Sequence, residues 1–195
     1  VPRRDVLEVR ERLRSDGSVY EPLHEEDFEP IIAKIRAEGI QSVAICFIHA
    51  YINPAHEIRA REILQAALGD EVSVTLSHEI AREWREYERA SSAIMNAYIA
   101  PVVQRYLTSL EHQLAEFGVN TAVHVMQSSG GIILAKTARE QPVHTLLSGP
   151  VGGTIGGVAL AKTAGRPNLL CVDMGGTSFD MSLIIDGKPG VSNET

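Results

Sequence analysis

The sequence has little of what marks several large classes of protein. Only 5% of its 195 residues are aromatic, and it holds one tryptophan and two cysteines, Cys46 and Cys171. Both cysteines sit in apolar runs, so we expect free, buried thiols in a reducing cytoplasm rather than a disulfide framework. No apolar run reaches the roughly 18 residues that a membrane-spanning helix needs, so we expect no membrane partner.

Basic residues are also in deficit. Lysine and arginine number 18 against 25 aspartate and glutamate, which gives a net charge of −7. A nucleic-acid partner would favour a basic surface, so we expect none. The seven histidines form no metal signature, since His78-Glu79 lacks the second histidine of an H-E-x-x-H motif. No nucleophile elbow appears, so any hydrolytic chemistry would need residues outside this chain.

What the sequence does have is an alternation of strand and helix patterns. Asp16-Gly17 predicts a hairpin near the start of the chain. Helices are predicted over 25–38 and 53–68, and between them the apolar run 42–48 predicts a strand buried on both faces. Alternation over 71–76 predicts another strand. The order indicates an α/β fold with a mixed or parallel sheet, covering helices, and 42–48 as a central strand.

A long helical pattern follows over 79–117. Pro101 predicts a break into two pieces, and Trp84 is expected to pack inward. Arg85 and Arg89 lie one helical turn apart, a spacing that suits an anion clamp. The alternative is a solvated helix face on which charges pair at i,i+3 and i,i+4.

Two glycine-rich segments come next. A strand over 121–127 leads into Ser128, Ser129 and two glycines, which suit a ligand-lining loop and equally a simple loop. A strand over 143–147 leads into a glycine turn and a helix from about residue 154, a pattern that favours anion binding. It matches neither a Walker A loop nor a dinucleotide fingerprint. We therefore expect close helix packing or a hinge at its glycines: Gly152, Gly153, Gly156 and Gly157.

The most informative stretch is 169–187. The apolar run 169–172 has the length of a buried strand and ends on Asp173. Gly175 and Gly176 then turn the chain. A second run alternates with period two, which predicts a strand with its apolar side chains on one buried face: Phe179, Met181, Leu183 and Ile185. We expect strand, tight turn and strand, with acids and a hydroxyl gathered at the turn: Asp173, Thr177 and Asp180.

Such a turn has the chemistry of a phosphate site. Glycines at positive φ point their N–H groups into one concavity, and Thr177 adds a donor. A carboxylate beside a phosphate needs a cation between them, so Asp173 and Asp180 indicate Mg²⁺, bound directly or through its waters. A carboxylate there would also orient an attacking water. The plain alternative is a hairpin whose acids are only solvated.

The octet D-x-G-G-T-S-x-D after an apolar strand resembles the second phosphate-binding hairpin of the actin, sugar kinase and Hsp70 ATPase superfamily. It is most similar to the hydantoinase A/oxoprolinase branch, of the N-methylhydantoinase A type. Further stretches share this resemblance, namely SHEIAREWREYERASS at 77–92, NAYIAPVVQRYL at 96–107, MQSSGG at 126–131 and HTLLSGPVGG at 144–153. Together they cover nearly the whole chain.

The resemblance implies an RNase H-like, actin-like ATPase fold within a longer two-domain subunit. Residues 1–147 would be the later part of the first α/β domain, and 148–195 would begin the second. A first phosphate hairpin would precede Val1, and adenosine-binding glycines would follow Thr195. We therefore expect a fragment that is inactive alone and that uses ATP and Mg²⁺ within the whole subunit.

By the same resemblance, Asp173 and Asp180 would be the catalytic acids, and Asp173 would also hold Mg²⁺. The nucleotide would contact the residues of the turn: Gly175, Gly176, Thr177 and Ser178. Weaker candidates for substrate contacts are Arg85, Arg89, Ser128 and Ser129.

Three functions agree with these features. The first is ATP-dependent opening of a cyclic amide, such as a hydantoin, oxoproline or a lactam, by phosphorylation of the carbonyl oxygen. An oligomeric assembly with a hydantoinase B-type partner subunit would accompany it. The second is the beta-type subunit of an acetone carboxylase-like, ATP-dependent carboxylase. The third is a non-catalytic module that keeps the ATPase fold. The same hairpin serves the first two, so this sequence does not separate them.

Overall fold

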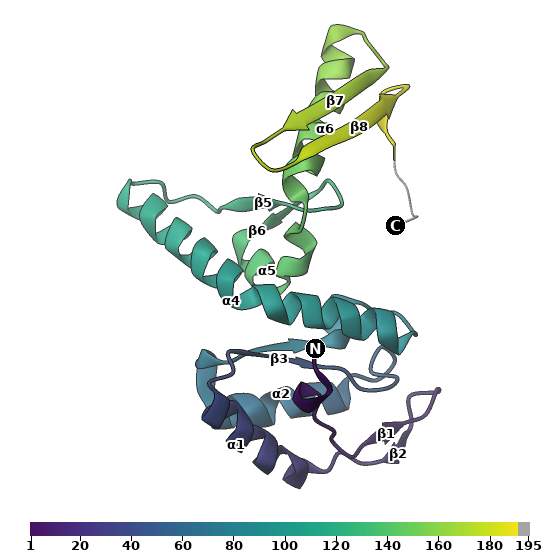
Figure 1. Ribbon diagram of the computed structural model, residues 1–195, viewed down its shortest axis with the longest axis vertical. Coiled ribbons are helices and arrows are strands. Elements are labelled where there is room, and N and C mark those ends of the chain that lie inside the picture. Colours follow the sequence, from purple (N-terminus) through teal and green to yellow (C-terminus); the bar gives the residue numbers. More distant parts are fainter. Residues whose placement is uncertain (191–195) are drawn as a thin grey trace. The chain divides into compact units, whose positions relative to one another are not determined.

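A computed structural model describes residues 1–190, and the chain forms two compact units (Figure 1). Unit 1 comprises residues 1–113 and 139–143, and unit 2 comprises 114–138 and the chain from 144 onward. The expected division into domains of a longer subunit, at residue 147, stays a prediction. No helix among residues 1–190 is both long enough and apolar enough to cross a membrane.

Unit 1 is an α/β layer built on two parallel strands, β3 (Ser42–Ile45) and β4 (Ser73–Leu76). Helices α1 (Phe28–Glu38) and α2 (Ala55–Leu68) lie on one side of the strands, and α4 (Glu86–Glu116) lies on the other (Figure 1). Its remaining elements are short: the 3₁₀ turns Arg3–Asp5, Glu25–Asp27 and Gly69–Glu71, the hairpin β1 (Arg12–Leu13) and β2 (Val19–Glu21), and α3 (Ser77–Ile80).

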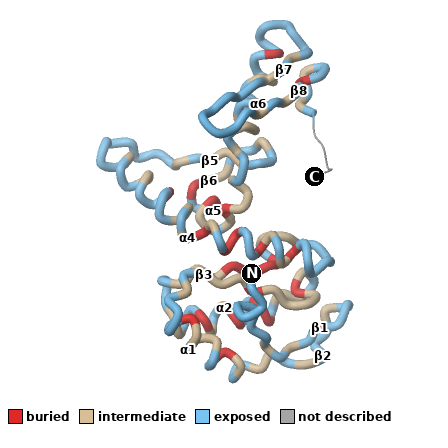
Figure 2. Tube along the Cα trace, viewed as in Figure 1, coloured by how far each residue is buried: buried red, intermediate tan, exposed pale blue. Residues whose placement is uncertain are grey.

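The local signals in unit 1 explain its turns and its core. Gly17 adopts φ 83 between β1 and β2, and Gly39 ends α1 at φ 62, conformations that glycine adopts without steric cost. Asn53 accepts the Ala55 N–H at 3.1 Å where α2 begins. Apolar side chains from the helices and strands then form one core cluster, shown in red in Figure 2: Phe28, Ile35, Ile45, Ala60, Leu64 and Leu76.

Residues 42–48 do not form the expected central strand. Within residues 1–190, β3 pairs only with β4, and it ends at Ile45. The Phe47 N–H donates to Glu57 at 3.0 Å, and the Phe47 carbonyl accepts from Arg89 at 2.6 Å. Because side chains take these main-chain groups, they are not available to extend the strand ladder.

The long helix of unit 1 also corrects two expectations. Helix α4 runs without a break through Pro101, although proline removes one main-chain hydrogen bond. Buried side chains at helical spacing on both sides of the proline, Ala97 and Leu107 among them, fix the helix by packing. Trp84 precedes the helix and is 66% exposed, so it does not pack inward.

Unit 2 places one helix against an antiparallel sheet. Helix α6 (Ser148–Ala164) contacts β7 (Leu169–Met174) and β8 (Phe179–Ile185), which pair with each other, and β9 (Lys188–Pro189) extends the sheet. The unit also holds the hairpin β5 (His124–Met126) and β6 (Ile132–Leu134), most of α5 (Ala135–Glu140), and the 3₁₀ turn Pro142–Thr145, whose last two residues belong to it.

The glycine-rich segment of unit 2 is helical, so the predicted strand over 143–147 and the glycine turn after it are wrong. Leu147 takes a left-handed φ of 57, and α6 begins at the next residue. A Cβ atom at Gly157 would overlap the Cys171 sulfur and lie 2.9 Å from Ile184 Cδ1. Close packing is therefore confirmed at Gly157. Added Cβ atoms at Gly153 and Gly156 would meet nothing within 4 Å, and at Gly152 only ordinary contact with Met126 at 3.7 Å.

The hairpin of unit 2 turns its apolar face outward, opposite to expectation. The buried or half-buried face of β8 carries Asp180, Ser182 and Ile184 and meets α6, where Ser182 hydrogen-bonds Thr154 at 2.7 Å. This contact and the close approach at Gly157 fix which face the helix covers. The opposite face is mostly exposed (Figure 2) and carries the larger apolar residues of both strands: Leu170, Val172, Met174, Phe179, Met181, Leu183 and Ile185.

Candidate functional site

The phosphate-type octet forms the predicted strand, turn and strand. β7 pairs with β8 in an antiparallel register that sets Asp173 directly opposite Asp180 and Met174 opposite Phe179. Directly opposed side chains share one face of a sheet, with Cβ atoms roughly 4.5–5.5 Å apart. The hairpin therefore brings two carboxylates together beside the turn, where like charges repel unless a cation lies between them.

The turn itself is short and open. The Gly175 N–H donates to the Ser178 carbonyl at 3.0 Å, and the Ser178 hydroxyl donates to Asp180 at 3.2 Å. No main-chain partner for the N–H groups of Gly176 and Thr177 is found in the described part of the chain. These two amides are thus available to an external acceptor.

The glycines of the turn leave open room beside the main chain, but they do not adopt a left-handed backbone. Neither Gly175 nor Gly176 has a positive φ, so the expected concavity of left-handed glycines is wrong. The left-handed residues of the sheet are Asp186 (φ 51) and Gly187 (φ 73), in the turn between β8 and β9. A Cβ atom at Gly176 would meet nothing within 4 Å. A ligand can therefore approach the main chain closely at this position.

The residues of the hairpin match the donor set that Mg²⁺ takes beside a phosphate. Mg²⁺ is bound through one or two carboxylates together with substrate phosphates and waters, and Asp173 and Asp180 supply two carboxylates. Within residues 1–190, no group of three or more His, Cys, Asp or Glu side chains is placed to hold a metal ion. A metal at this hairpin would thus depend on the two acids and on the phosphate.

Arg85 and Arg89 have different surroundings and do not form a clamp here. The Arg85 guanidinium is exposed, lies 5.0 Å from the centre of the Trp84 ring, and pairs loosely with Glu88 at 3.6 Å. Arg89 is fully buried. Its three side-chain nitrogens donate to Ser77 Oγ at 3.0 Å and to the carbonyls of Glu83 at 2.8 Å and Phe47 at 2.6 Å. Because protein atoms take all three nitrogens, Arg89 is not free to bind an anion in this structure.

Ser128 and Ser129 belong to the tight turn between β5 and β6. The Ser128 amide and hydroxyl both donate to the His144 carbonyl, at 2.7 and 2.9 Å, and Ser129 is exposed. Gly130 takes φ 87, and a Cβ atom there would meet Ile155 of α6 at 3.1 Å. The structure thus gives Ser128 a turn-forming role, and a substrate role for either serine stays a prediction.

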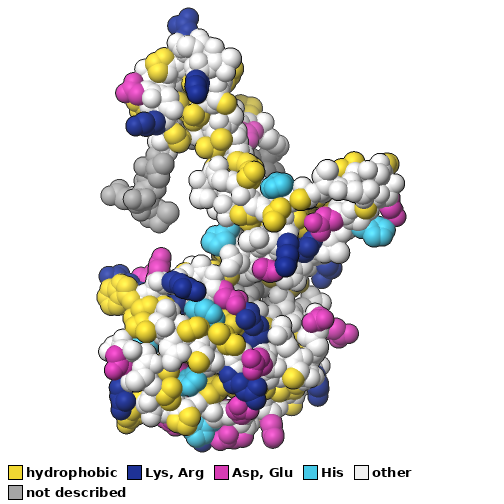
Figure 3. Space-filling model, turned by 180° about the vertical axis from the view of Figure 1, so that it is seen from behind, with side chains coloured by type: hydrophobic (Ala, Val, Ile, Leu, Met, Phe, Trp, Pro, Cys, Tyr) yellow, Lys and Arg dark blue, Asp and Glu magenta, His cyan; other side chains and the backbone are white. Residues whose placement is uncertain are grey.

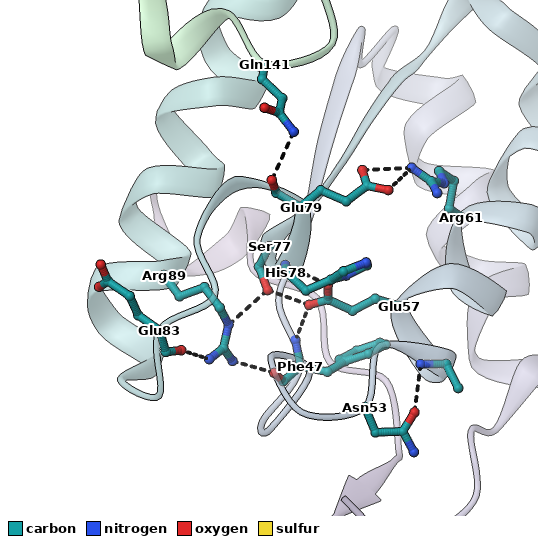
Figure 4. Close-up of polar contacts among 11 residues, drawn as sticks. Phe47, Asn53, Glu57, Arg61, Ser77, His78, Glu79, Glu83, Arg89 and Gln141 are labelled. Carbon is teal, nitrogen blue, oxygen red and sulfur yellow. Dashed lines mark hydrogen bonds and ion pairs between the residues drawn. The ribbon is translucent and has the colours of Figure 1, made fainter. Parts of the chain in front are cut away.

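A buried polar network in unit 1 was not expected from the sequence (Figure 4). Glu57 on α2 is 0% exposed. Its carboxylate accepts from the Phe47 amide at 3.0 Å, the Ser77 hydroxyl at 2.6 Å, and the His78 amide and ring Nδ1 at 3.1 and 2.6 Å. Through Ser77 the network continues to Arg89. It therefore joins α2, α3, α4 and the segment after β3.

Electrostatics explain why this carboxylate remains charged. Burial by itself raises the pKa of Glu57, but hydrogen bonds from His78, Ser77 and two main-chain amides hold its pKa below the ordinary 4.5. Burial also raises the pKa of the neighbouring Cys46 thiol. One sequence signal was available: Glu57 shares a helical face with Ala60 and Leu64, so an acid occupies a core position.

Charge elsewhere on unit 1 is mixed. On the face shown in Figure 3, acidic and basic side chains are interspersed rather than separated by sign. Several of them form exposed pairs, such as Arg59 with Glu25 at 2.7 Å, and exposed pairs contribute little to stability. The unusual electrostatic feature of unit 1 is therefore inside it.

Comparison with known proteins identifies the family. Residues 89–195 match the hydantoinase/oxoprolinase family, and residues 1–68 match the hydantoinase/oxoprolinase N-terminal region. The chain belongs to the hydantoinase/oxoprolinase family. The resemblance carried by the octet and by the motifs before it is thereby confirmed.

The relatives in this family include proteins named as a caprolactamase subunit, a 5-oxoprolinase and a carboxylase subunit. The alpha subunit of caprolactamase from Pseudomonas jessenii is 37% identical over 195 residues, which is all of this chain and 28% of that protein. The beta subunit of acetone carboxylase from Xanthobacter autotrophicus is 30% identical over 197 residues, again all of this chain and 27% of that protein. The 5-oxoprolinase of Saccharomyces cerevisiae is 35% identical over 166 residues, 84% of this chain and 12% of that protein. The chain thus spans little more than a quarter, or less, of each relative.

Solved structures confirm the fold class. The crystal structure of ATP-dependent caprolactamase from Pseudomonas jessenii aligns with a TM-score of 0.82 and 38% identity, covering 94% of this chain and 26% of that one. Nucleotide-free acetone carboxylase aligns with a TM-score of 0.81 and 31% identity, covering 92% of this chain and 26% of that one. This family fold, a mixed α/β arrangement with covering helices, is therefore the fold of the chain.

Proposed function

We propose that this chain supplies a phosphate-binding hairpin to an ATP-dependent enzyme that opens a cyclic amide. One observation carries the proposal: in a member of the hydantoinase/oxoprolinase family, the octet that joins β7 to β8 folds so that Asp173 and Asp180 face each other beside an open turn. Two carboxylates next to free amides are the pairing that a metal-bound phosphate requires.

Each residue of the hairpin has a distinct part in this proposal. Asp173 and Asp180 hold Mg²⁺, directly or through its waters, and their charge balances the cation that accompanies the phosphates. The open positions at Gly175 and Gly176 admit a phosphate close to the main chain, where the Gly176 and Thr177 amides are free to donate. Ser178 donates to Asp180 and orients that carboxylate. ATP, when bound, would supply a phosphoryl group to the amide oxygen, which makes the carbonyl carbon a better electrophile, so that water can add to it and the ring C–N bond can break.

The cyclic amide is proposed from the names of relatives. Caprolactamase and 5-oxoprolinase are both named for the opening of a ring amide, and the caprolactamase structure is described as ATP-dependent. An amide carbonyl is a poor electrophile, so its activation by ATP would lower the barrier to attack by water. We also propose a hydantoinase B-type partner subunit and an oligomeric assembly, because the caprolactamase and acetone carboxylase relatives are named as subunits. A cytoplasmic location is proposed from the free cysteines Cys46 and Cys171, which suit a reducing compartment.

An ATP-dependent carboxylase is the second candidate. The TM-score of 0.81 to acetone carboxylase, at 31% identity, favours it nearly as strongly. The phosphate hairpin would have the same use in both enzymes, because only the carbonyl compound that is activated differs. A non-catalytic module with the ATPase fold is the third candidate, and it predicts no ATP turnover at all.

The test is a substrate comparison in the subunit that contains this chain, together with its partner. Release of inorganic phosphate from ATP is measured with a lactam, with oxoproline, with a hydantoin, and with acetone plus bicarbonate. The proposal predicts phosphate release that rises with a cyclic amide and matches the amount of ring opened. Stimulation by acetone and bicarbonate alone would favour the carboxylase, and no stimulation would favour the non-catalytic module.

The isolated chain is proposed to be inactive. A phosphoryl-transfer site must exclude water and hold its metal from both sides, and this chain contributes one phosphate hairpin. Phosphate release from ATP by the purified 195-residue chain should therefore stay at background. Sustained turnover that Asp173→Asn abolishes would refute this expectation.

A further inference from the structure

Unit 1 holds a polar cavity of about 750 Å³ beside β4, between α2, α3 and α4. Small-molecule sites have volumes of roughly 300–1,000 Å³, so its size suits a small ligand. The His78 ring lines this cavity and is 6% exposed. The buried network described above thus reaches the cavity wall through one imidazole.

Glu57 determines which hydrogen-bonding role His78 offers to the cavity. The Nδ1 atom of His78 lies 2.6 Å from the Glu57 carboxylate (Figure 4), and a carboxylate that is ionised accepts a proton there. The proton of the neutral ring is therefore on Nδ1, and Nε2 carries a lone pair. No partner for Nε2 is found in the described part of the chain. His78 consequently presents a fixed acceptor to the cavity.

Two glutamines of the cavity wall, like His78, have a free hydrogen-bond acceptor. The Gln104 side-chain NH₂ donates to the Arg139 carbonyl at 3.1 Å, and the Gln141 NH₂ donates to the Glu79 carbonyl at 3.0 Å. The Gln104 NH₂ also donates to Ser73 Oγ at 3.4 Å, so both of its N–H groups are engaged, whereas Gln141 keeps one N–H. No hydrogen bond to either amide oxygen is found among residues 1–190, so both oxygens are left as acceptors. Three acceptors therefore line one cavity.

The charges of the wall do not favour an anionic ligand. Arg61 is paired with Glu79 at 2.9 Å, and Arg82 has no bonding partner among residues 1–190. The acids Asp70 and Glu140 also line the cavity, so positive charge is not in excess. Arg82 and the second N–H of Gln141 remain as donors for a carbonyl oxygen.

We propose that this cavity binds a small neutral amide, whose N–H donates to His78 Nε2 or a glutamine oxygen and whose carbonyl accepts from Arg82. A carboxylate ligand has no N–H to give, so it would leave the acceptors unpaired, which strongly disfavours binding. That the amide is cyclic rests on the proposed function, whereas the arrangement of acceptors does not.

The test is an NMR titration of the protein with 2-pyrrolidinone, without ATP. The ¹⁵N spectrum of His78 should first show the proton on Nδ1 and none on Nε2. Added lactam should then shift the His78 ring signals and the side-chain amide signals of Gln104 and Gln141 in a saturable way. Acetate, a small carboxylate with no N–H, should not compete.

Matched variants separate the cavity from the fold. His78→Phe and Gln141→Leu each remove an acceptor and should weaken lactam binding about tenfold, the effect of one lost hydrogen bond in a buried site. His56→Phe is the control, because His56 also binds a carboxylate, Glu11 at 2.7 Å, but does not line the cavity. Lactam binding to the His56→Phe variant should be unchanged, and circular dichroism checks that every variant is folded. If His78→Phe does not fold, Gln141→Leu carries the test.

Three results would overturn the proposal: a proton on His78 Nε2, no saturable shifts at the cavity residues, or competition by acetate as strong as that of a second lactam. The outcome is independent of ATP chemistry. A chain that binds lactam without ATP turnover would refute the proposed function alone, and turnover without lactam in this cavity would refute this inference alone.

Discussion

In unit 1 the buried polar groups around Glu57 are engaged with one another, whereas in unit 2 the hairpin leaves Asp173 and two turn amides open. Glu57 and Arg89 are both 0% exposed and satisfy their hydrogen bonds inside the protein. Asp173 lies on an exposed strand end, opposite another acid, and no ion pair to it is found within residues 1–190. Buried charged residues are therefore structural in unit 1, whereas in unit 2 an acid is left without a partner in the described part of the chain.

A candidate ligand site can be recognised by polar groups that the protein itself leaves unpaired. A fully buried charged group whose nitrogens each donate to a protein atom, such as Arg89, holds the fold together and is not available to a ligand. An opposed pair such as Asp173 and Asp180 is unfavourable by itself. It is therefore a candidate for binding something that the chain does not supply.

Replacing Glu57 with alanine should cause the largest loss of stability. The change leaves the Ser77 hydroxyl, the His78 ring and two amides without their acceptor inside the protein. Breaking a buried charged network in this way costs about 3–5 kcal/mol. Urea unfolding measures it. The control is Glu62→Ala on the same helix, which removes only an exposed pair with Arg59 and should change stability by less than about 1 kcal/mol. Equal effects of the two variants would contradict the account.

Adding one methyl group to α6 should separate packing from helix propensity. Gly157→Ala forces Cβ against Cys171 and Ile184 and should destabilise unit 2 by about 1–3 kcal/mol. Gly153→Ala places the same group in open space and should stabilise the helix by up to about 1 kcal/mol. Thermal unfolding of both variants tests the pair. Stabilisation by both would show that the helix does not approach the sheet as closely as described.

Acid should weaken unit 1 through Glu57. Since its folded-state pKa lies below 4.5, its contribution to stability is complete above pH 4.5 and is lost as the pH falls through the folded-state value. Glu57→Gln should remove this part of the pH dependence. Other acids also titrate in this range, such as Asp27, whose pKa Arg10 lowers to about 2. They contribute equally to the acid profiles of the wild type and of Glu57→Gln. Identical acid profiles of wild type and Glu57→Gln would be evidence against an ionised Glu57.

Gly176→Ala should have the smallest effect on folding. The backbone at Gly176 is not left-handed and nothing lies within 4 Å of an added Cβ, so stability should change by less than about 0.5 kcal/mol. Nucleotide binding by the full subunit should nevertheless weaken, and more so in Gly176→Val, because the side chain fills the space proposed for a phosphate. Unchanged binding in the valine variant would mean that no ligand approaches the main chain there.

Local patterns predicted most of the elements. Asp16-Gly17 predicted a hairpin, Gly39 predicted a helix end, and the period of residues 179–185 predicted a strand, because each signal depends on a few neighbouring residues. Packing decided what local patterns could not. The glycines after Leu147 are helical, and α4 continues through Pro101, because tertiary contacts outweigh weak local preferences.

The candidate site was predicted in part. The octet predicted the hairpin and acids gathered at its turn, because a short turn brings the ends of the two strands together. The register that sets Asp173 directly opposite Asp180 came from the structure. It did not predict the φ angles of Gly175 and Gly176 or the face of β8 that α6 covers. Glu57 and His78 escaped prediction because they are far apart in sequence and meet only through the packing of α2 against β4.

The most direct test of the central claim is ATP-dependent ring opening by the complete subunit with Asp173→Asn. Asparagine keeps the shape of the side chain and removes the charge proposed to hold Mg²⁺, so folding should remain intact while the rate falls about 100–1,000-fold. The control is Asp186→Asn, an exposed acid in the β8–β9 turn, where asparagine tolerates the left-handed φ of 51. The account predicts a large loss for Asp173→Asn and none for Asp186→Asn. Near-normal turnover in Asp173→Asn, with an unchanged circular dichroism spectrum, would show that the hairpin is structural.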